Sequence, residues 1–257
     1  MLAETPLLSI RNVSKNYGVV AAVNDVSLDV AKGEICGVIG PNGSGKSTLF
    51  DCVTGLQKPS AGSVSLAGTD ITGWPINRIA REGGLLRSFQ RTVVFETATP
   101  EENLIISGQM FRFPNILSTF SIGPASRRRI ATLRDEARAM LDLIGLAHVA
   151  HMPAGKLSGG QQKLLQFGSM LISRPKLILL DEPLAGINPK LIESVVATIS
   201  RANRDLGVTF VIIEHNIDVM MSLCQRVIVL DQGAILAEGP PAAIVSDKRV
   251  VEAYLGG

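Results

Sequence analysis

The first candidate for chemistry is an eight-residue loop that reads GPNGSGKS and matches the pattern GxxxxGK[ST]. Glycines in such a loop let backbone N–H groups approach an anion, and the helix that follows adds its positive end. Lys46 would supply a cation for the β- and γ-phosphates, and the Ser47 hydroxyl a ligand for Mg²⁺. A glycine-rich turn before a helix is the alternative. The predicted nucleotide-binding residues are Gly40, Pro41, Asn42, Gly43, Ser44, Gly45, Lys46 and Ser47.

Two adjacent acids, Asp181 and Glu182, end an apolar run in LILLDEP. At the carboxyl end of a buried parallel strand, such acids lie where ligands of open α/β sheets bind. Side chains alternate along a strand, but at its end the chain turns and both carboxylates can converge. We expect Asp181 to hold Mg²⁺, directly or through water, and Glu182 to polarise the attacking water as general base. The alternative is that one acid caps the next helix.

A second glycine-containing stretch, residues 157–163, reads LSGGQQK. Ser158 and Gln161 have the spacing of a capping box, which predicts a helix with apolar positions at Leu164, Leu165, Gly168 and Leu171. The cap does not explain Gly159 and Gly160, because glycine in a helix interior costs about 1 kcal/mol relative to alanine. We therefore predict a second anion site at this helix start. It would complete either the chain's own pocket or that of another subunit, and the residues alone leave both open.

Strands must position these segments. Residues 7–30 alternate, with apolar Val26, Leu28 and Val30 separated by polar residues, so this region and GSVSLAGTDI predict half-exposed antiparallel strands. Nearly continuous apolar runs at 35–39, 177–180 and 208–213 are typical of strands buried on both faces of a parallel sheet. Because helical patterns follow them, we predict a mixed α/β core with an antiparallel piece at the front.

The middle of the chain, from 100 to 145, is predicted to be mainly helical. Its apolar residues recur at intervals of three and four positions, at Ile130, Leu133, Ala137, Met140, Leu141 and Ile144. Arginines at 127, 128, 129, 134 and 138 lie mostly off this stripe and are interpreted as a solvated face. Lipid headgroups or a partner protein are the alternatives.

Composition narrows the class of protein. The 257 residues contain 25 Lys and Arg against 23 Asp and Glu, a net charge of +2, which gives no field that demands nucleic acid. Cys36, Cys52 and Cys224 lack CxxC spacing, which argues against a disulfide framework or zinc site and favours a reducing compartment. We expect no signal peptide, because Glu4 stands where one would carry positive charge, and no membrane-spanning run of ~18 apolar residues.

The phosphate loop, LSGGQ and LILLDEP, in this order and spacing, resemble the ATP-binding cassette (ABC) family over nearly the whole chain. The resemblance implies a P-loop NTPase (RecA-like) α/β core with an N-terminal antiparallel β subdomain and an inserted α-helical subdomain. It implies one domain over 1–257, with the catalytic core in 1–89 and 175–257. The helical subdomain, which carries the signature LSGGQ, would be 90–174.

The family pattern also implies roles for single residues. Tyr17 in KNYG matches the aromatic that stacks on adenine, and Thr48 completes the phosphate loop. Gln90 in RSFQR matches the glutamine that senses Mg²⁺ or water, and His215 in IIEHN matches the switch histidine near the γ-phosphate. In this family two subunits dimerise head to tail, so the signature would close over the partner's ATP through Ser158, Gly159, Gly160 and Gln161.

Whole segments look like the ATPases of bacterial importers of branched-chain or other hydrophobic amino acids, among them EHNIDVMM and the C-terminal GPPAAIVSDKRVVEAYLG. This implies integral permeases and a second ATPase as partners, a periplasmic binding protein indirectly, no nucleic acid, and a peripheral position on the cytoplasmic face of the inner membrane. Asn188 and Glu214 depart from the commoner aspartate and threonine or serine, which puts charge-dependent coupling at Asn188 in doubt.

Other assignments are importers of urea or short amides, exporters of lipopolysaccharide, and soluble cassette ATPases of DNA repair or translation. The soluble ATPases usually carry a long coiled-coil insertion or two cassettes, whereas this chain has one cassette and a short helical insertion. A P-loop kinase would leave LSGGQ and His215 unexplained.

Overall fold

The computed structural model describes residues 5–88, 92–112 and 124–255, which belong to two compact units. The first unit is drawn from residues 1–88, 176–183 and 206–257, and the second from 89–175 and 184–205. The insertion predicted at 90–174 falls within the span of the second unit, which also takes in residues 184–205. The division into catalytic core and helical subdomain at these boundaries stays a prediction.

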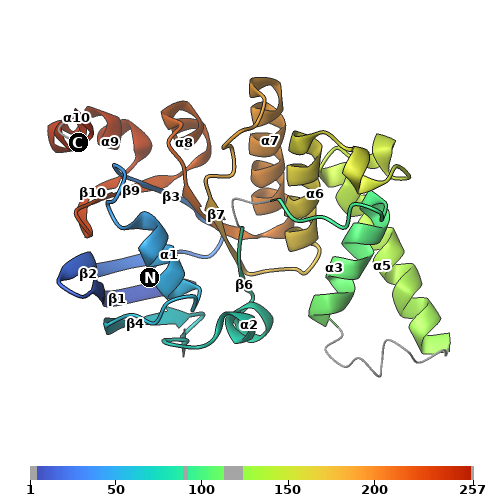
Figure 1. Ribbon diagram of the computed structural model, residues 1–257, viewed down its shortest axis with the longest axis horizontal. Coiled ribbons are helices and arrows are strands. Elements are labelled where there is room, and N and C mark those ends of the chain that lie inside the picture. Colours follow the sequence, from blue (N-terminus) through green and yellow to red (C-terminus); the bar gives the residue numbers. More distant parts are fainter. Residues whose placement is uncertain (1–4, 89–91, 113–123, 256–257) are drawn as a thin grey trace. The chain divides into compact units, whose positions relative to one another are not determined.

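An antiparallel sheet begins the first unit, as the alternating pattern predicts (Figure 1). Val26, Leu28 and Val30 face its buried side, and the polar residues between them are exposed. Its two long strands pair with Leu8 opposite Val30, and the register shifts between Ile10 and Asn16. Its strands, in spatial order, are β2 (Val20–Val30), β1 (Leu8–Tyr17), β4 (Ala61–Leu66) and β5 (Thr69–Asp70).

The second sheet has six strands in the order β10-β9-β3-β8-β7-β6, parallel throughout except for β10, which pairs antiparallel with β9. The three apolar runs became β3, β7 and β8, and every residue of these strands is buried, as predicted. The strands are β3 (Ile35–Ile39), β6 (Leu85–Arg87), β7 (Leu177–Asp181), β8 (Thr209–Ile213), β9 (Arg226–Asp231) and β10 (Ala234–Gly239).

Helices complete the first unit, and α9 and α10 pack beside β9 and β10 (Figure 1). Asn216 caps α8, its side-chain oxygen accepting from the Val219 N–H at 3.1 Å. The helices are α1 (Lys46–Val53), α2 (Ile76–Arg78) with a π-helical turn over Ile79–Gly83, α8 (Ile217–Leu223), α9 (Pro241–Ser246) and α10 (Lys248–Leu255).

One hydrophobic core joins both sheets to α1. It includes Val13 and Val26 of the antiparallel sheet, Val38 and Ile228 of the parallel sheet, and Phe50 of α1. The parallel strands are therefore covered on this face, as strands of such sheets require.

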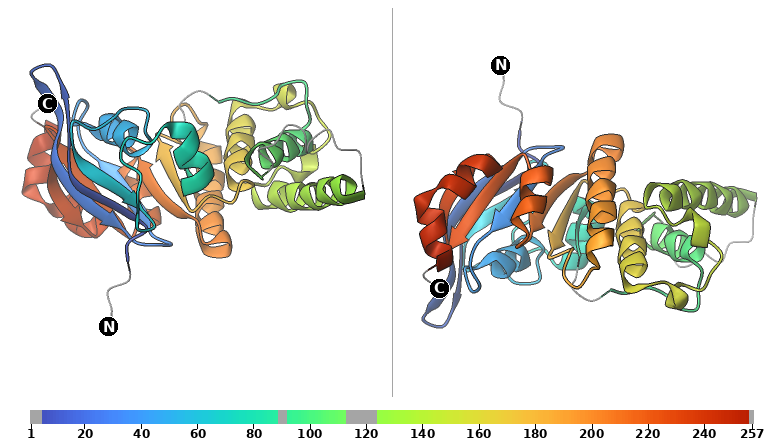
Figure 2. Two further views of the ribbon diagram at one scale, coloured as in Figure 1. Left: turned by 90° about the horizontal axis from the view of Figure 1, so that it is seen from below. Right: turned by 90° about the horizontal axis from the view of Figure 1, so that it is seen from above.

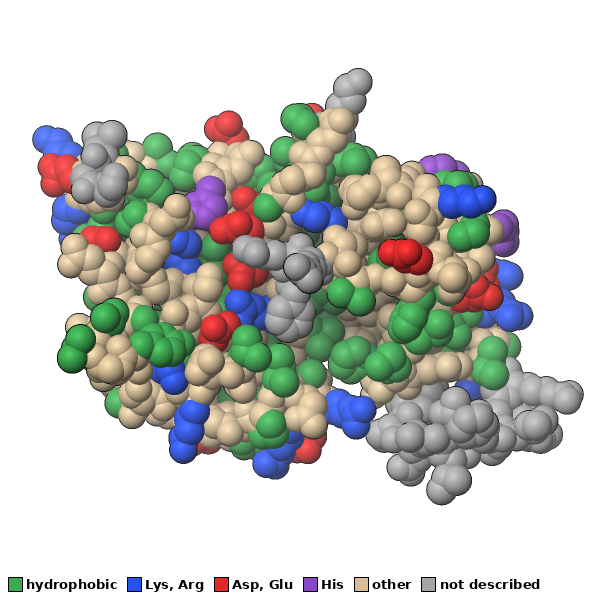
Figure 3. All heavy atoms as spheres, in the orientation of Figure 1, with side chains coloured by type: hydrophobic (Ala, Val, Ile, Leu, Met, Phe, Trp, Pro, Cys, Tyr) green, Lys and Arg blue, Asp and Glu red, His purple; other side chains and the backbone are tan. Residues whose placement is uncertain are grey.

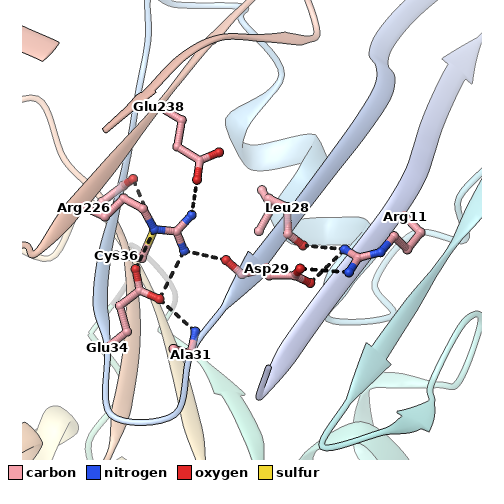
Figure 4. A network of polar contacts seen from close by, with 9 residues as sticks. Arg11, Leu28, Asp29, Ala31, Glu34, Cys36, Arg226 and Glu238 are labelled. Atoms are coloured by element: carbon pink, nitrogen blue, oxygen red, sulfur yellow. Dashed lines mark hydrogen bonds and ion pairs between the residues drawn. The ribbon is translucent and has the colours of Figure 1, made fainter. Parts of the chain in front are cut away.

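A polar network links the rims of the same two sheets (Figure 4). Arg226 on β9 donates to Glu34 Oε1 at 2.7 Å, and also contacts Glu238 and the Asp29 carbonyl. Arg11 of β1 completes the network through an ion pair of 2.8 Å with the Asp29 carboxylate. The hydrogen bond from Arg11 lowers the pKa of Asp29.

The second unit is helical, and α3, α5 and α6 lie side by side in it (Figures 1 and 2). Their close approach uses small residues: a Cβ on Gly168 of α6 would lie 2.8 Å from Ile144 Cδ1. The helices are α3 (Pro100–Arg112), α5 (Pro124–Leu143), α6 (Gly159–Leu171) and α7 (Pro189–Leu206), with 3₁₀ turns at Ala147–Val149 and Ala154–Lys156.

The predicted apolar stripe is buried from Leu133 to Ile144, but Ile130 is exposed. The prediction that the whole apolar stripe is packed was wrong for Ile130. This residue lies about one turn closer to the start of α5 than Leu133, the first buried residue of the stripe. Arg134 and Arg138 lie 3.4 and 3.5 Å from Glu101 and are both more than half exposed, which fits a solvated face.

Charged side chains of both signs are interspersed on the face drawn in Figure 3, over the residues that the structure describes. Among those residues, the helices are all too short or too polar to cross a membrane.

Candidate functional site

The phosphate loop lies between β3, which ends at Ile39, and α1, which begins at Lys46. This strand–loop–helix arrangement confirms the predicted local structure. Gly40 has φ +150°, and a Cβ there would lie 2.1 Å from the Leu230 carbonyl oxygen. Any other residue at this position would collide with β9, so the first glycine is required by packing as well as by conformation.

Segments far along the chain hold this loop in place. The Ser44 carbonyl accepts a bond of 3.1 Å from the N–H of Gly233, which lies in the β9–β10 turn. The Gly40 N–H donates to the hydroxyl oxygen of Tyr254, on α10, at 2.8 Å. Tyr254 was not predicted, because it lies 214 residues from its partner and no local pattern marks it.

Lys46 is buried and folds back onto its own loop. Its ammonium donates to the carbonyls of Gly40 at 2.8 Å and Pro41 at 2.9 Å. Burial lowers the pKa of Lys46, while the charges of Glu182 and Asp181 act in the opposite direction. The same Lys46 donors are available for phosphate oxygens in place of these carbonyls.

The acid pair is separated by a backbone turn. Asp181 is the last residue of β7, and Glu182 has φ +48°, a left-handed conformation that is rare outside glycine. The Glu182 N–H donates to the Ile213 carbonyl at 2.9 Å, so the turn is anchored to β8. This turn changes the direction of the chain between the two carboxylates, as the sequence argument required.

His215 follows β8 and reaches the second acid. Its Nε2 lies 3.0 Å from Glu182 Oε1, with the histidine side chain 42% and the glutamate 30% exposed. Glu214 is buried, and its carboxylate accepts from the His215 backbone N–H at 3.0 Å. The variant acid therefore helps to fix the backbone that carries the histidine.

Arg87, the last residue of β6, is a second site residue that the sequence did not reveal. Its guanidinium bonds to Asp181 Oδ2 at 2.7 Å and also pairs with Asp51 on α1. The pairs span 94 and 36 residues, and arginine at a strand end is a common surface feature, so no local signal marked this one.

Four predicted residues outside LSGGQ remain, of which Tyr17, Ser47 and Thr48 lie in the first unit. Tyr17 ends β1 and is 47% exposed as a residue, and the Lys15 ammonium lies 5.2 Å from the centroid of its ring. Ser47 is exposed and Thr48 half-buried in the first turn of α1. Gln90 lies outside the described residues.

The signature segment starts α6 in the second unit. Ser158 Oγ accepts from the Gln161 N–H at 3.3 Å, and Gln161 Oε1 accepts from the Ser158 N–H at 3.0 Å, which confirms the capping box. Its glycines differ. A Cβ on Gly159 would meet no heavy atom within 4 Å, whereas one on Gly160 would lie 2.2 Å from Leu191 Cδ1 of α7. Packing against α7 therefore accounts for a glycine at position 160. The space around Gly159 is unfilled by the described residues, so packing does not account for a glycine there.

The donor set suits Mg²⁺ bridged to a nucleotide. Ser47 and Asp181 offer hard oxygen ligands, and the described residues contain no group of three or more His, Cys, Asp or Glu that could hold a metal alone. Mg²⁺ usually binds through one or two protein oxygens together with phosphate oxygens and water. The Asp181 hydrogen bond uses Oδ2, and Oδ1 makes none among the described residues.

The first unit thus defines a class: a P-loop nucleotide-binding protein of the α/β type, with the glycine-rich loop, a strand-end acid pair and a histidine at one edge of a parallel sheet. Residues 23–185 match the family described as ABC transporter, and residues 234–257 match one described as branched-chain amino acid ATP-binding cassette transporter. The chain therefore belongs to the ABC transporter family and is one of its ATP-binding cassettes.

Individual relatives agree with this assignment. The chain is 36% identical over 251 residues to the high-affinity branched-chain amino acid transport ATP-binding protein BraF of Pseudomonas aeruginosa, with 98% of each chain covered. It is 35% identical over 251 residues to LivG of Escherichia coli K12, again with 98% of each covered.

Solved structures give the same fold. A nucleotide-free ATP-binding cassette from an ABC transporter superposes with a TM-score of 0.82 at 33% identity, covering 98% of this chain and 100% of that one. A cassette in its ADP conformation gives a TM-score of 0.83 at the same identity and coverage.

Proposed function

We propose that the chain hydrolyses ATP to energise the import of branched-chain or other hydrophobic amino acids across the inner membrane. The observation that carries the hydrolytic part is the Glu182–His215 contact of 3.0 Å beside the phosphate loop. The substrate class is supported by the match of residues 234–257 and by the names of the relatives, which are similar over nearly their whole length.

In this mechanism the phosphate loop binds the nucleotide. Lys46 exchanges its loop carbonyls for β- and γ-phosphate oxygens, while the start of α1 offers its positive end to the same anion. Tyr17 presents an exposed ring on which adenine stacks. Ser47 and Asp181 would hold Mg²⁺, with Gln90 as the sensor, and the bound ion would neutralise charge on the phosphates.

Hydrolysis requires water to attack the γ-phosphorus while the bond from that phosphorus to the β–γ bridging oxygen breaks. Glu182 orients the water and accepts its proton, and ADP and phosphate leave. His215 positions Glu182 through the 3.0 Å contact, and its Nε2–H would be shared between the Glu182 carboxylate and a γ-phosphate oxygen. The left-handed backbone of Glu182, anchored by its N–H bond to the Ile213 carbonyl, fixes the turn from which its carboxylate is presented.

The signature segment would act on a partner's nucleotide. Ser158, Gly159 and the start of α6 form an exposed anion-binding end, and Gln161 lies in its first turn. We therefore propose a head-to-tail dimer, of two copies or of two related cassettes, in which this end closes over the ATP of the other subunit. Closure would drive the permeases at the cytoplasmic face of the membrane, and hydrolysis would reopen the dimer.

The test is reconstitution. The chain is purified with its permeases and periplasmic binding protein in proteoliposomes, and ATP hydrolysis is measured with leucine, isoleucine, valine, urea or short amides bound to the binding protein. Stimulation by the branched-chain amino acids, with none from urea or amides, is the expected result. Stimulation by urea or amides alone would contradict the substrate assignment.

A further inference from the structure

Arg87 occupies a place that the proposed reaction does not use. Its guanidinium lies between two carboxylates, Asp181 Oδ2 at 2.7 Å and the closely paired Asp51. The Arg87 side chain is 8% exposed, and those of Asp181 and Asp51 are 9% and 23% exposed. This is a buried arginine shared between the predicted metal ligand and an acid of α1.

Several contacts fix the arginine there. Arg87 pairs with Leu179 in the β6–β7 ladder, and its guanidinium carbon lies 5.7 Å from the centroid of the Phe50 ring. The next residue, Ser88, accepts from the Asp181 N–H through its hydroxyl at 3.1 Å. Both the side chain and the backbone of Asp181 are therefore held from β6.

The hydrogen bonds of Arg87 serve the carboxylates. Its Nε is buried and has no hydrogen-bond partner among the described residues, so both of its side-chain bonds go to acids. A buried carboxylate is costly unless a counter-ion neutralises it. Lys46 is engaged with the carbonyls of its own loop, so among the residues that the structure describes Arg87 is the cation that pairs directly with Asp181.

A metal at Asp181 would meet this positive charge. Arg87 and a divalent cation repel each other, and both are attracted to one carboxylate, so the binding of the metal is coupled to the presence of the arginine. Building on the metal role proposed for Asp181, we propose that Arg87 is the resident counter-ion of Asp181 and sets how strongly nucleotide binding depends on Mg²⁺.

The test compares nucleotide affinity with and without metal. The dissociation constant of a fluorescent ATP analogue is measured for the full chain in Mg²⁺ and in EDTA, and the ratio of the EDTA value to the Mg²⁺ value is the readout. In Arg87→Met, the Asp181 carboxylate has lost its counter-ion, and Mg²⁺ neutralises it instead. The ratio should therefore rise about tenfold over wild type. An unchanged or lower ratio would overturn the inference.

Two further variants separate charge from structure. Arg87→Lys keeps the cation, and its ratio should stay within about twofold of wild type, although both Arg87 variants lower the melting temperature. In Asp51→Asn, Arg87 pairs with Asp181 alone and competes more strongly with Mg²⁺ for that carboxylate. The ratio for this variant should therefore fall below that of wild type. If the role of Arg87 were purely structural, each variant would have a lower melting temperature, and all three EDTA-to-Mg²⁺ ratios would equal that of wild type.

Failure of the proposed metal site looks different. If wild-type affinity were the same in Mg²⁺ and in EDTA, Asp181 would have no metal role and the inference would fall with it. If wild type depends on Mg²⁺ and the Asp51→Asn ratio rises, only the counter-ion role of Arg87 is contradicted. Because Asp51→Asn keeps the arginine in place, it decides the question even where Arg87→Met does not fold.

Discussion

The two glycines of the signature should respond oppositely to substitution. Gly159 and Gly160 are consecutive residues in the first turn of α6, yet a side chain at Gly159 would be in open space while one at Gly160 would meet Leu191. We compare Gly159→Glu, which adds charge without a clash, with Gly160→Ala, which adds one methyl group against α7.

The magnitudes follow from these surroundings. At Gly160 the Cβ would lie 2.2 Å from Leu191 Cδ1, and overpacking of this kind costs about 1–3 kcal/mol, partly offset by up to about 1 kcal/mol of better helix propensity. We expect a melting temperature lower by about 2–6 °C. At Gly159 a glutamate in the first helical turn is neutral or stabilising by about 0.3–1 kcal/mol.

ATP turnover should be affected in the reverse order, with the larger loss in Gly159→Glu. A carboxylate at Gly159 facing the partner's phosphates costs about 1–4 kcal/mol at ~4 Å, which is roughly 5- to 1000-fold in turnover. We expect Gly159→Glu to melt like wild type and bind ATP normally as a monomer, but to hydrolyse it slowly in the reconstituted complex. Wild-type turnover with Gly159→Glu would refute the view that this helix end meets a partner's nucleotide. Gly160→Ala combined with Leu191→Ala is the control, because it removes the clash.

Two other predictions concern the first unit. Tyr254→Phe deletes only the hydroxyl that accepts from the Gly40 N–H. This amide should therefore exchange hydrogen at least about fivefold faster, and ATP binding should weaken by a similar factor. Unchanged exchange would show that the bond is absent in solution. Burial raises the pKa of Cys52 to about 11 and of Cys224 to about 12, and also raises that of Cys36. At pH 8 the native thiols should therefore resist iodoacetamide, because only about one Cys52 side chain in a thousand is a thiolate. The urea-unfolded chain should label fully. Rapid labelling of the native chain would contradict the burial of the three thiols.

Local patterns were enough for much of the fold. The runs that became β3, β7 and β8 are continuous because both faces of each strand are covered, and that burial is visible in sequence. The capping box of Ser158 and Gln161 and the turn of the phosphate loop are likewise made by neighbouring residues. Such features depend on short-range geometry, so their spacing predicts them.

Contacts between distant segments were not predictable in this way. Arg87 and Tyr254 reach the site across long stretches of chain, and each is an ordinary residue for its element. The closeness of Gly160 to Leu191, on a helix that follows later in the chain, is likewise invisible in the local pattern, and the contact of Gly160 with a partner's ATP stays a prediction. The exposure of Ile130 has a similar origin, because periodicity gives the face of a helix but not where the packing along it begins.

The role of Glu182 as the general base of an ATPase is tested by the rate of ATP hydrolysis by Glu182→Gln in the reconstituted complex. Glutamine keeps the size and the neighbourhood of His215 but cannot accept the proton of water. We expect turnover at least about 100-fold lower than wild type, with unchanged ATP binding and a dimer that persists in ATP. Turnover within about threefold of wild type would contradict this role.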